Sequence, residues 1–285
     1  MILGLRLGDL SPGGLNEGAL LAEQAGVDFV LLGDPAATGE GPVGDDPLSL
    51  AAFLMTTTQT IGLIACICDD WAPFNVARAL ASFDLLSGGR CGWVAVRAPD
   101  AETARSVEHL DVVLQLFDSW EDEALVLDKP SGVFADRTKV HRIRHAGVFY
   151  TVDGPLNAPR SPQGRPVLFQ PIATASEDAD LVLIDFADLG EDHQRVGSAK
   201  RLAEARFDSG MESGAAFAER LTAAFRDGLC DGFVLSGDPS DIAKLMAEVA
   251  PALRAQDLVE FGESNFRTRL GLPRPANPFA GQVGP

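Results

Sequence analysis

Short apolar segments alternate with longer amphipathic segments along most of this chain. Seven of the short segments are apolar enough for buried strands and too short for buried helices; they cover residues 2–7, 27–32, 61–67, 91–96, 166–172, 180–186 and 232–237. Buried strands that alternate with helices indicate a parallel sheet that helices cover. Seven or eight such units in one chain favour a closed barrel over an open sheet. The predicted fold class is therefore α/β, a TIM-like (β/α) barrel of seven to eight parallel strands.

One segment shows the alternation in detail. In FNVARALASFDLL, Val76, Leu80 and Phe83 recur at helical spacing, and Pro73 before them suits a first helical turn. The glycine pair at 88–89 suits a left-handed stop at the end of this helix. CGWVAV then predicts a buried strand directly after a tight loop. The charged residues of the segment are predicted to tie helix to loop by hydrogen bonds: Arg78, Asp84 and Arg90.

Two segments interrupt the alternation. Residues 128–165 are rich in proline, glycine and charge, and they are predicted to form an insertion before the fifth strand. Residues 187–231 hold two helix-like stretches, AKRLAEARF and AAFAERLTAAFRDG, with no strand between them. We therefore expect seven parallel strands, or eight with one irregular. The whole chain, residues 1–285, is expected to be one domain, with the polar, proline-rich residues 262–285 as a covering arm.

Charge and composition exclude several classes of protein. The chain has 23 basic and 41 acidic residues, a net charge of −18, which argues against nucleic acid or an anionic membrane as partner. No window approaches the roughly 18 apolar residues of a membrane span, and the first residues do not resemble a signal peptide. The cysteines are few and lie mostly in apolar runs, so we expect buried free thiols, no metal and a cytoplasmic protein: Cys66, Cys68, Cys91 and Cys230.

Three blocks of the sequence resemble one known family. PFNVARALASFDLLSGGRCGWVAV resembles the P-Y-N-x-A-R-x-x-A-S-L-D-x-L-S-G-G-R-x-G-W-N block of the bacterial-luciferase-like flavin-dependent monooxygenases. The insertion, from DSWEDEALVLDKPSGVF to PQGRPVLFQ, is similar to that of the branch with nitrilotriacetate and dibenzothiophene-sulfone monooxygenases. DGFVLSGD and TRLGLPRPAN resemble the C-terminus of the same branch. The likeness runs from about residue 27 to 277, and residues 187–231 are shorter than in full-length members, so the chain looks like a shortened member.

The resemblance implies a function and a site. Members take reduced FMN from a separate reductase, activate oxygen at the flavin and oxidise a small organic substrate, at the carboxyl ends of the barrel strands. Carried over position by position, the family pattern implies these cofactor-binding residues: Asp34, Cys68, Val94, Arg97, Gln170 and Thr174. A homodimer is expected from the apolar second and third helices, where residues 48–55 form a notably apolar run.

Several of these positions depart from the family pattern. Val94 stands where members have asparagine, and QPIAT replaces Q-A-G-S-S, so the glycine that cradles phosphate is missing. The histidine and tyrosine that members carry on the fourth helix, where they help to bind phosphate, are deleted before VEHLDVV. The alternative is therefore a non-catalytic or accessory paralogue that binds flavin weakly.

Four of the implied residues also have purely structural interpretations. Asp34 is equally suited to opening a turn by bonding its own backbone. Gln170 at a strand end can satisfy backbone groups, and Thr174 can cap the helix that follows. Cys68 suits inert packing, because a reactive thiolate needs a positive charge nearby.

The last implied residue, Arg97, replaces a threonine of the family and is the most specific candidate. A cation at a strand end can meet a phosphate or an acidic substrate, although a surface ion pair with Asp100 or Glu102 explains it equally. FMN binding is expected to be weak, because Pro171 has no N–H and Ile172 obstructs close approach of a phosphate. We expect whatever affinity remains to depend on Arg97.

Two further motifs are weaker. GEGPVG at residues 39–44 imitates a dinucleotide-binding turn, but it begins too far from its strand and suits a flexible loop over the barrel mouth. His141 and His145 form H-x-x-x-H without the glutamate of a metalloprotease. His145 matches the histidine of the family's H-x-G-x-x-F and is expected to organise the insertion.

Overall fold

The computed structural model describes residues 1–8, 11–34, 46–98, 101–190, 196–255 and 265–280. The chain divides into two compact units. The first comprises Met1–Cys66, Gly92–Val96 and Leu168–Ser264, and the second comprises Ile67–Cys91, Arg97–Val167 and Asn265–Pro285. The motif GEGPVG at 39–44 and the Asp100 partner expected for Arg97 lie outside the described residues.

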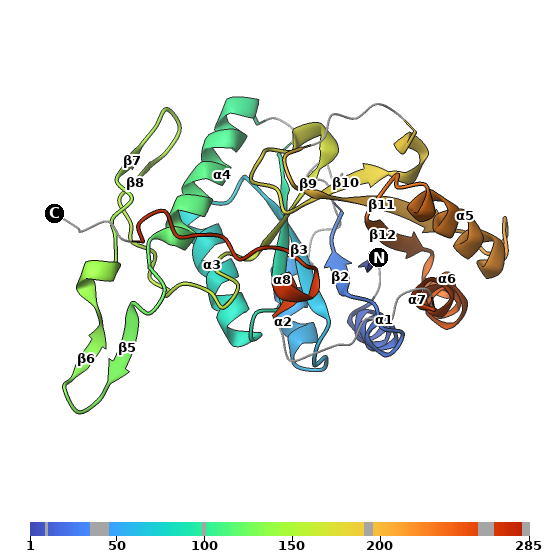
Figure 1. Cartoon of the computed structure of the whole chain (residues 1–285), viewed down its shortest axis with the longest axis horizontal. Helices are drawn as coiled ribbons and strands as arrows, with labels where there is room; N and C mark the ends of the chain where they lie inside the picture. The colour runs from blue at the N-terminus through green and yellow to red at the C-terminus, as the bar shows by residue number, and fades with distance from the viewer. Residues whose placement is uncertain (9–10, 35–45, 99–100, 191–195, 256–264, 281–285) are drawn as a thin grey trace. The chain divides into compact units, whose positions relative to one another are not determined.

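Eight parallel strands close a barrel (Figure 1). In order around the barrel they are β1 (Ile2–Leu7), β12 (Gly232–Gly237), β11 (Lys200–Phe207), β10 (Leu181–Asp185), β9 (Val167–Pro171), β4 (Cys91–Val96), β3 (Gly62–Cys68) and β2 (Phe29–Leu32). Most of their residues are buried, which explains why they are apolar along their length and do not alternate with polar residues. The predicted fold class is confirmed.

The eighth strand corrects the sequence interpretation. The stretch AKRLAEARF was predicted to be helical, but Lys200–Phe207 forms β11, a regular strand of eight residues. It pairs in parallel with β10 on one side and with β12 on the other, from Leu181↔Lys200 to Phe207↔Gly237. The expectation of seven strands, or of an irregular eighth, is therefore wrong.

Three of the helices named here for the first unit begin at side-chain caps. The named helices are α1 (Pro12–Gln24), α2 (Pro47–Met55), α5 (Gly214–Arg226), α6 (Pro239–Lys244) and α7 (Ala250–Arg254), with a π-helical turn at Leu245–Val249 between the last two. Short 3₁₀ helices follow β9 and β10, at Ile172–Thr174 and Phe186–Asp188. Ser11, Asp46 and Ser213 each accept a hydrogen bond from a backbone N–H of the first turn.

The second unit holds two long helices and the insertion. The helices are α3 (Pro73–Leu86) and α4 (Thr103–Asp118), and a short α8 (Phe266–Arg269) belongs to the C-terminal arm. The insertion contains a hairpin of β5 (Leu125–Asp128) and β6 (Val133–Ala135), a 3₁₀ turn at Arg137–Lys139, and a second hairpin of β7 (His145–Ala146) and β8 (Thr151–Val152). It precedes β9, the fifth barrel strand, as predicted.

The turn between α3 and β4 has the predicted left-handed stop. Gly88 and Gly89 have φ of 68° and 86°, and a Cβ on Gly89 would lie 2.8 Å from the Cβ of Asn265. Asp84, at the end of α3, accepts the Cys91 N–H at 3.0 Å and the Gln163 side-chain amide at 2.6 Å. The helix, the first strand residue and the end of the insertion are thus bonded to one carboxylate.

A buried ion-pair network fixes the root of the insertion. Asp118, fully buried at the end of α4, accepts from Arg160 at 2.7 Å and is also paired with Arg165. The Asn277 side-chain amide donates to the Asp118 backbone carbonyl at 3.0 Å, and the Phe279 ring stacks on His141 at 4.5 Å. Within this unit, residues 265–280 of the predicted arm therefore pack on the insertion.

Surface and composition features complete the fold. No helix within the described ranges is long and apolar enough to cross a membrane. The same residues contain no cluster of three or more His, Cys, Asp or Glu side chains that could hold a metal ion.

On α2, Phe53 is 43% exposed while Ala51 and Leu54 are buried, so only part of the apolar run at 48–55 faces solvent. The predicted homodimer therefore stays a prediction.

Candidate functional site

The surroundings of Gly4 show which face of β1 points into the barrel. The Phe29 ring occupies the space that a Cβ on Gly4 would need, at 2.3 Å, and it meets the Phe169 ring edge-on at 5.2 Å. β1 and β9, which carry Gly4 and Phe169, stand opposite each other in the closed strand order. This face of β1 therefore points into the barrel. Arg6, two residues beyond Gly4, lies on the same face.

Arg6 is the centre of a charged cluster in the first unit. Its guanidinium pairs with the Glu204 carboxylate of β11, with β12 between the two strands. The Asp34 carboxylate, directly after β2, lies 3.4 Å from Arg6 Nη1. The Arg6 and Glu204 side chains are only about a quarter exposed, at 24% and 25%, whereas Asp34 is half exposed. Part-buried charges of this kind are held in one geometry by their pairing.

The two cysteines near the carboxyl end of β3 remain thiols. Burial raises the pKa of Cys66 well above its ordinary range, and the neighbouring Arg6 guanidinium only partly opposes this. Burial also raises the pKa of Cys68, and the carboxylates of Asp69 and Asp70 add to the rise while a backbone hydrogen bond from Asp70 opposes it. A thiol whose pKa is raised carries little thiolate, so neither residue is a nucleophile at neutral pH.

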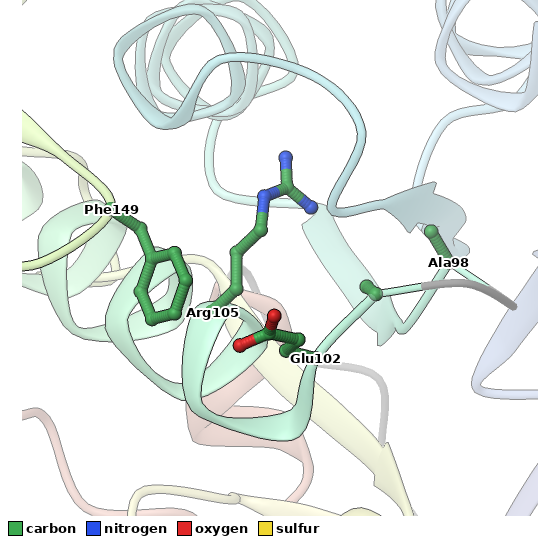
Figure 2. A pocket seen from close by; sticks show the side chains of 5 residues that line it. Ala98, Glu102, Arg105 and Phe149 are labelled. Atoms are coloured by element: carbon green, nitrogen blue, oxygen red, sulfur yellow. The ribbon is translucent and has the colours of Figure 1, made fainter.

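The second unit contains a cavity of about 360 Å³ at the start of α4. Its lining residues are Ala98, Ala101, Glu102, Arg105 and Phe149. Figure 2 shows the Arg105 side chain extending from α4 between the Phe149 ring and the chain at Ala98. The Arg105 guanidinium lies 3.8 Å from the buried Asp69 carboxylate and 5.6 Å from the centre of the Tyr150 ring.

The N-terminal end of α4 contributes Glu102 and Arg105 to the lining of this cavity. Glu102 occupies the N-cap position, but its side chain makes no capping hydrogen bond. The free N–H groups of a first helical turn attract anions, and the helix dipole supports this. Asp69 also accepts the Ala98 N–H at 2.9 Å, so the loop after β4 is held against the residues that follow β3.

A buried histidine on α4 contacts Tyr150, the residue over which Arg105 lies. His109 on α4 is 3% exposed, and its Nε2 lies 2.9 Å from the Trp71 carbonyl. A carbonyl only accepts, so Nε2 carries the proton in this contact. Burial lowers the pKa of His109 below its ordinary value, although the Trp71 bond and Asp69 oppose this. The His109 ring also meets the Tyr150 ring edge-on, with 5.7 Å between the ring centres. The neutral His109 therefore packs against Tyr150, over whose ring the Arg105 guanidinium lies.

Two of the predicted site residues are used within their own turn. The Gln170 side-chain oxygen accepts from the Ser176 N–H and hydroxyl at 3.0 and 2.9 Å, and its amide donates to the Thr174 carbonyl at 3.4 Å. The Thr174 hydroxyl donates to the Pro171 carbonyl at 3.3 Å. These bonds close the 3₁₀ turn after β9. Gln170 thus satisfies backbone groups, as its structural interpretation states, whereas Thr174 caps no helix, because the next element along the chain is the strand β10.

The other predicted residues lie in different surroundings. Val94 is fully buried in β4. Asp34 pairs with Arg6. Arg97 is exposed, and its Nη1 donates to the Thr103 hydroxyl at 2.8 Å, at the first residue of α4. The role of these residues in binding a cofactor stays a prediction.

Sequence reasoning missed Arg6, Glu204 and Arg105. Glu204 was missed because its segment was interpreted as a helix, although Ala203, Ala205 and Phe207 alternate with charged residues. Arg6 is the charged residue inside the first apolar run, and that isolation was a usable signal. Arg105 lies two residues before VEHLDVV, near the family deletion, and had no distinguishing pattern.

Comparison with known proteins places the chain in a family. The family model described as luciferase-like monooxygenase matches residues 8–182. The chain belongs to this family. One of the subunits of pristinamycin IIA synthase, from Streptomyces pristinaespiralis, is 37% identical over 262 residues, which cover 91% of this chain and 88% of that protein. Dibenzothiophene-sulfone monooxygenase of Rhodococcus erythropolis is 42% identical over 149 residues, but these cover only 46% of this chain and 33% of that protein.

A solved structure agrees at the level of the fold. Riboflavin lyase (RcaE), solved with modified FMN and riboflavin, has a TM-score of 0.80 and 21% sequence identity, with 96% of each chain covered. At this identity the match supports the luciferase-like barrel and no residue roles. The family predicted from the three sequence blocks, and its branch with dibenzothiophene-sulfone monooxygenase, are confirmed.

The luciferase-like family implies FMN, so the donors present can be tested against it. FMN joins an apolar ring system to a phosphate. The turn after β9 does not fit the phosphate, because Pro171 has no N–H and the Gln170 side chain is already bonded. The cavity at α4 fits it better, because Arg105 and the uncapped first turn supply donors beside the Phe149 ring. Glu102 in the same lining opposes an anion.

Proposed function

We propose that this chain is an FMN-dependent monooxygenase that oxidises a small organic substrate with O₂, using reduced FMN from a separate reductase. The observation that carries the proposal is the α4 cavity, with Arg105 in its lining, in a chain of the luciferase-like family. FMN when bound supplies the oxygen chemistry, which protein side chains cannot perform themselves. The modified FMN in riboflavin lyase supports the choice of flavin.

In this proposal, the chain's own residues bind and orient the FMN. Arg105 contributes a charge-assisted hydrogen bond to the phosphate, and Phe149 shields that end from water. Asp69 holds the Arg105 guanidinium from the protein side. Within the first unit, the Arg6–Glu204 pair holds two opposite charges in a fixed geometry. Free buried thiols favour a reducing compartment, so we place the protein in the cytoplasm.

The function is tested by mixing photoreduced FMN with O₂ in the presence and absence of the protein. A monooxygenase of this kind holds reduced flavin away from water, so the return of oxidised-flavin absorbance is expected to change in rate when protein is in excess. Reoxidation identical to that of free FMN, at protein concentrations that saturate binding, contradicts the proposal. A protein that never saturates FMN contradicts it as well.

Replacing Arg105 by alanine is expected to weaken FMN binding by about tenfold to a hundredfold, because one charge-assisted hydrogen bond contributes roughly 1.5–3 kcal/mol. Riboflavin has no phosphate, so its dissociation constant is expected to stay within about twofold. Fluorescence quenching of both flavins measures the effect. Arg97→Ala is the matched variant, since Arg97 is the cation predicted from the sequence and lies outside the cavity lining. Loss of FMN affinity in Arg97→Ala with none in Arg105→Ala assigns the phosphate to Arg97 instead.

A second candidate function is an accessory component of a larger luciferase-like enzyme, with weakened flavin binding. Two observations favour it. The relative that matches along most of its length is named as one of the subunits of a synthase, whereas the dibenzothiophene-sulfone monooxygenase matches over a third of its length. The turn after β9 also has its donors and acceptors engaged. Reoxidation unchanged by the protein in the FMN experiment above favours this candidate.

A further inference from the structure

The turn between β7 and β8 is attached to α4 by a single carboxylate. Glu108, on α4, accepts hydrogen bonds from the backbone N–H groups of Val148, Phe149 and Tyr150, at 3.1, 3.1 and 2.8 Å. Successive N–H groups that converge in this way form a nest for an anion. The Glu108 side chain is only 14% exposed, so these charge-assisted hydrogen bonds are largely shielded from water.

A histidine of β7 completes the surroundings of this carboxylate. His145 Nε2 lies 3.1 Å from Glu108 Oε1, and because an ionised carboxylate only accepts, Nε2 carries the proton. Although burial opposes it, the hydrogen bonds from His145 and from the three N–H groups hold the pKa of Glu108 below its ordinary value. Glu108 is therefore ionised at neutral pH, and both of its oxygens act as acceptors for the turn.

Gly147 leaves the space that the carboxylate occupies. A Cβ at this position would lie 2.1 Å from Glu108 Oε1 and 2.6 Å from His145 Nε2, closer than non-bonded atoms approach. Any side chain at position 147 would therefore displace the carboxylate from the N–H groups. The segment HAGVFY thus supplies a histidine, a glycine and three backbone donors to one acceptor on α4.

Apolar packing contributes little to the position of this turn. Val148 is 87% exposed and Phe149 is 37% exposed. β7 and β8 have only two residues each, and a short two-stranded sheet is marginal by itself. The Tyr150 ring has a second contact with α4, through His109. Phe149 is therefore the residue of the turn whose placement depends most on Glu108.

The same turn contributes to the lining of the α4 cavity. Phe149 is one of the lining residues, and so is Arg105, which precedes Glu108 by one turn of the helix. Figure 2 shows the Phe149 ring beside the Arg105 side chain. Both groups are thus attached to α4, the guanidinium covalently and the aromatic ring through Glu108. Glu108 itself is not among the lining residues.

We propose that Glu108 is a positioning residue for the flavin site, which fixes the β7–β8 turn so that Phe149 lines the cavity before FMN binds. This inference rests on the proposed function, because it takes FMN as the occupant of the cavity. A cavity wall that is ordered in advance lowers the entropic cost of binding. If that wall has to be ordered by the ligand, affinity is expected to fall about threefold to tenfold.

The test measures the turn and the flavin separately in the full chain. Hydrogen exchange with mass spectrometry follows the N–H groups of residues 148–150, and fluorescence quenching gives the FMN dissociation constant. In Glu108→Ala these N–H groups are expected to exchange at least about tenfold faster. FMN binding is expected to weaken about threefold to tenfold. Gly147→Ala is expected to have both effects, because its methyl group displaces the carboxylate. The double variant is expected to bind FMN no more weakly than Glu108→Ala alone, since both changes remove the same contact.

Glu121→Ala is the matched control. Glu121 pairs with His141 of the same insertion at 2.7 Å, and both side chains are 12% exposed, but neither residue lines the cavity. This variant is expected to leave exchange at residues 148–150 unchanged and the FMN dissociation constant within about twofold.

Unchanged exchange in Glu108→Ala overturns the inference, and so does faster exchange with FMN affinity equal to that of the wild type. Equal effects in Glu121→Ala, or losses that add in the double variant, overturn it as well. A wild-type chain that binds no FMN contradicts the proposed function instead. The exchange measurement uses no flavin, so it still decides whether Glu108 positions the turn.

Discussion

Replacing Asp118 by alanine is expected to lower the free energy of unfolding by about 3–5 kcal/mol, because the change leaves a buried charge without its partner. Asp118 is fully buried, and the side chain of its partner Arg160 is 2% exposed. Arg165 also loses the carboxylate that it shares with Arg160. Urea denaturation followed by circular dichroism measures the change.

The matched control is Asp153→Ala, which removes a carboxylate from the exposed pair with Arg142. Exposed pairs contribute little, so this variant is expected to lose less than about 1 kcal/mol. Equal losses in the two variants would contradict the burial argument. Limited proteolysis adds a local readout, because the insertion and the arm are both bonded at Asp118.

The Asp118 network explains how an insertion rich in proline and charge keeps a defined position. Arg160 joins three segments, since it donates to Asp118 of α4 and to the Pro275 carbonyl of the arm. Arg274 of the arm forms a two-bond pair with Asp122, at 2.6 and 2.7 Å. Paired arginines therefore hold the root of the insertion against α4 and the arm.

Most of the fold could be predicted because its signals are local. The seven predicted strands are apolar along their length, and the Gly88–Gly89 stop follows from the conformational freedom of glycine. β11 could not be predicted in this way. Alanine, arginine, glutamate and leucine favour helices, and KRLAEARF becomes a strand because β10 and β12 pair with both of its edges. That information lies in distant segments.

The candidate site was harder to predict for a related reason. The strand ends were located correctly, but which polar groups remain available depends on contacts that no spacing reveals. Gln170 and Ser176 are six residues apart and satisfy each other after β9. Arg6 and Glu204 are separated by nearly 200 residues of sequence and meet only when the barrel closes. Family resemblance indicates which positions of the sequence belong to the site. Which contacts each of those side chains makes depends on the folded structure.

Replacing Asp84 by alanine is expected to cost about 3 kcal/mol, since it removes the acceptor of two buried hydrogen bonds that contribute roughly 1.5 kcal/mol each. The donors are the Cys91 N–H and the Gln163 amide, at 3.0 and 2.6 Å. Asp84→Asn keeps an acceptor oxygen of the same shape and is expected to cost less than about 1.5 kcal/mol. Urea denaturation of both variants at one pH measures how much of the stability depends on the acceptor oxygen and how much on the charge of the carboxylate. Equal losses would mean that the negative charge itself is required.

The pH dependence of the same pair tests the charge directly. Burial raises the pKa of Asp84 above its ordinary 3.8, against the hydrogen bonds from Ser161, Gln163 and Cys91. The folded protein therefore keeps the Asp84 proton to higher pH than the unfolded chain does. Where the folded state binds more protons, stability falls as pH rises, so this contribution is lost from the ordinary value up through the raised pKa. The amide that replaces the carboxyl in Asp84→Asn has no proton to lose. Relative to the wild type, this variant is therefore expected to gain stability as the pH rises from acidic to neutral. Unfolding midpoints of both proteins at successive pH values measure this gain. A difference in midpoint that does not change with pH would show that the Asp84 carboxyl titrates alike in the folded and unfolded states.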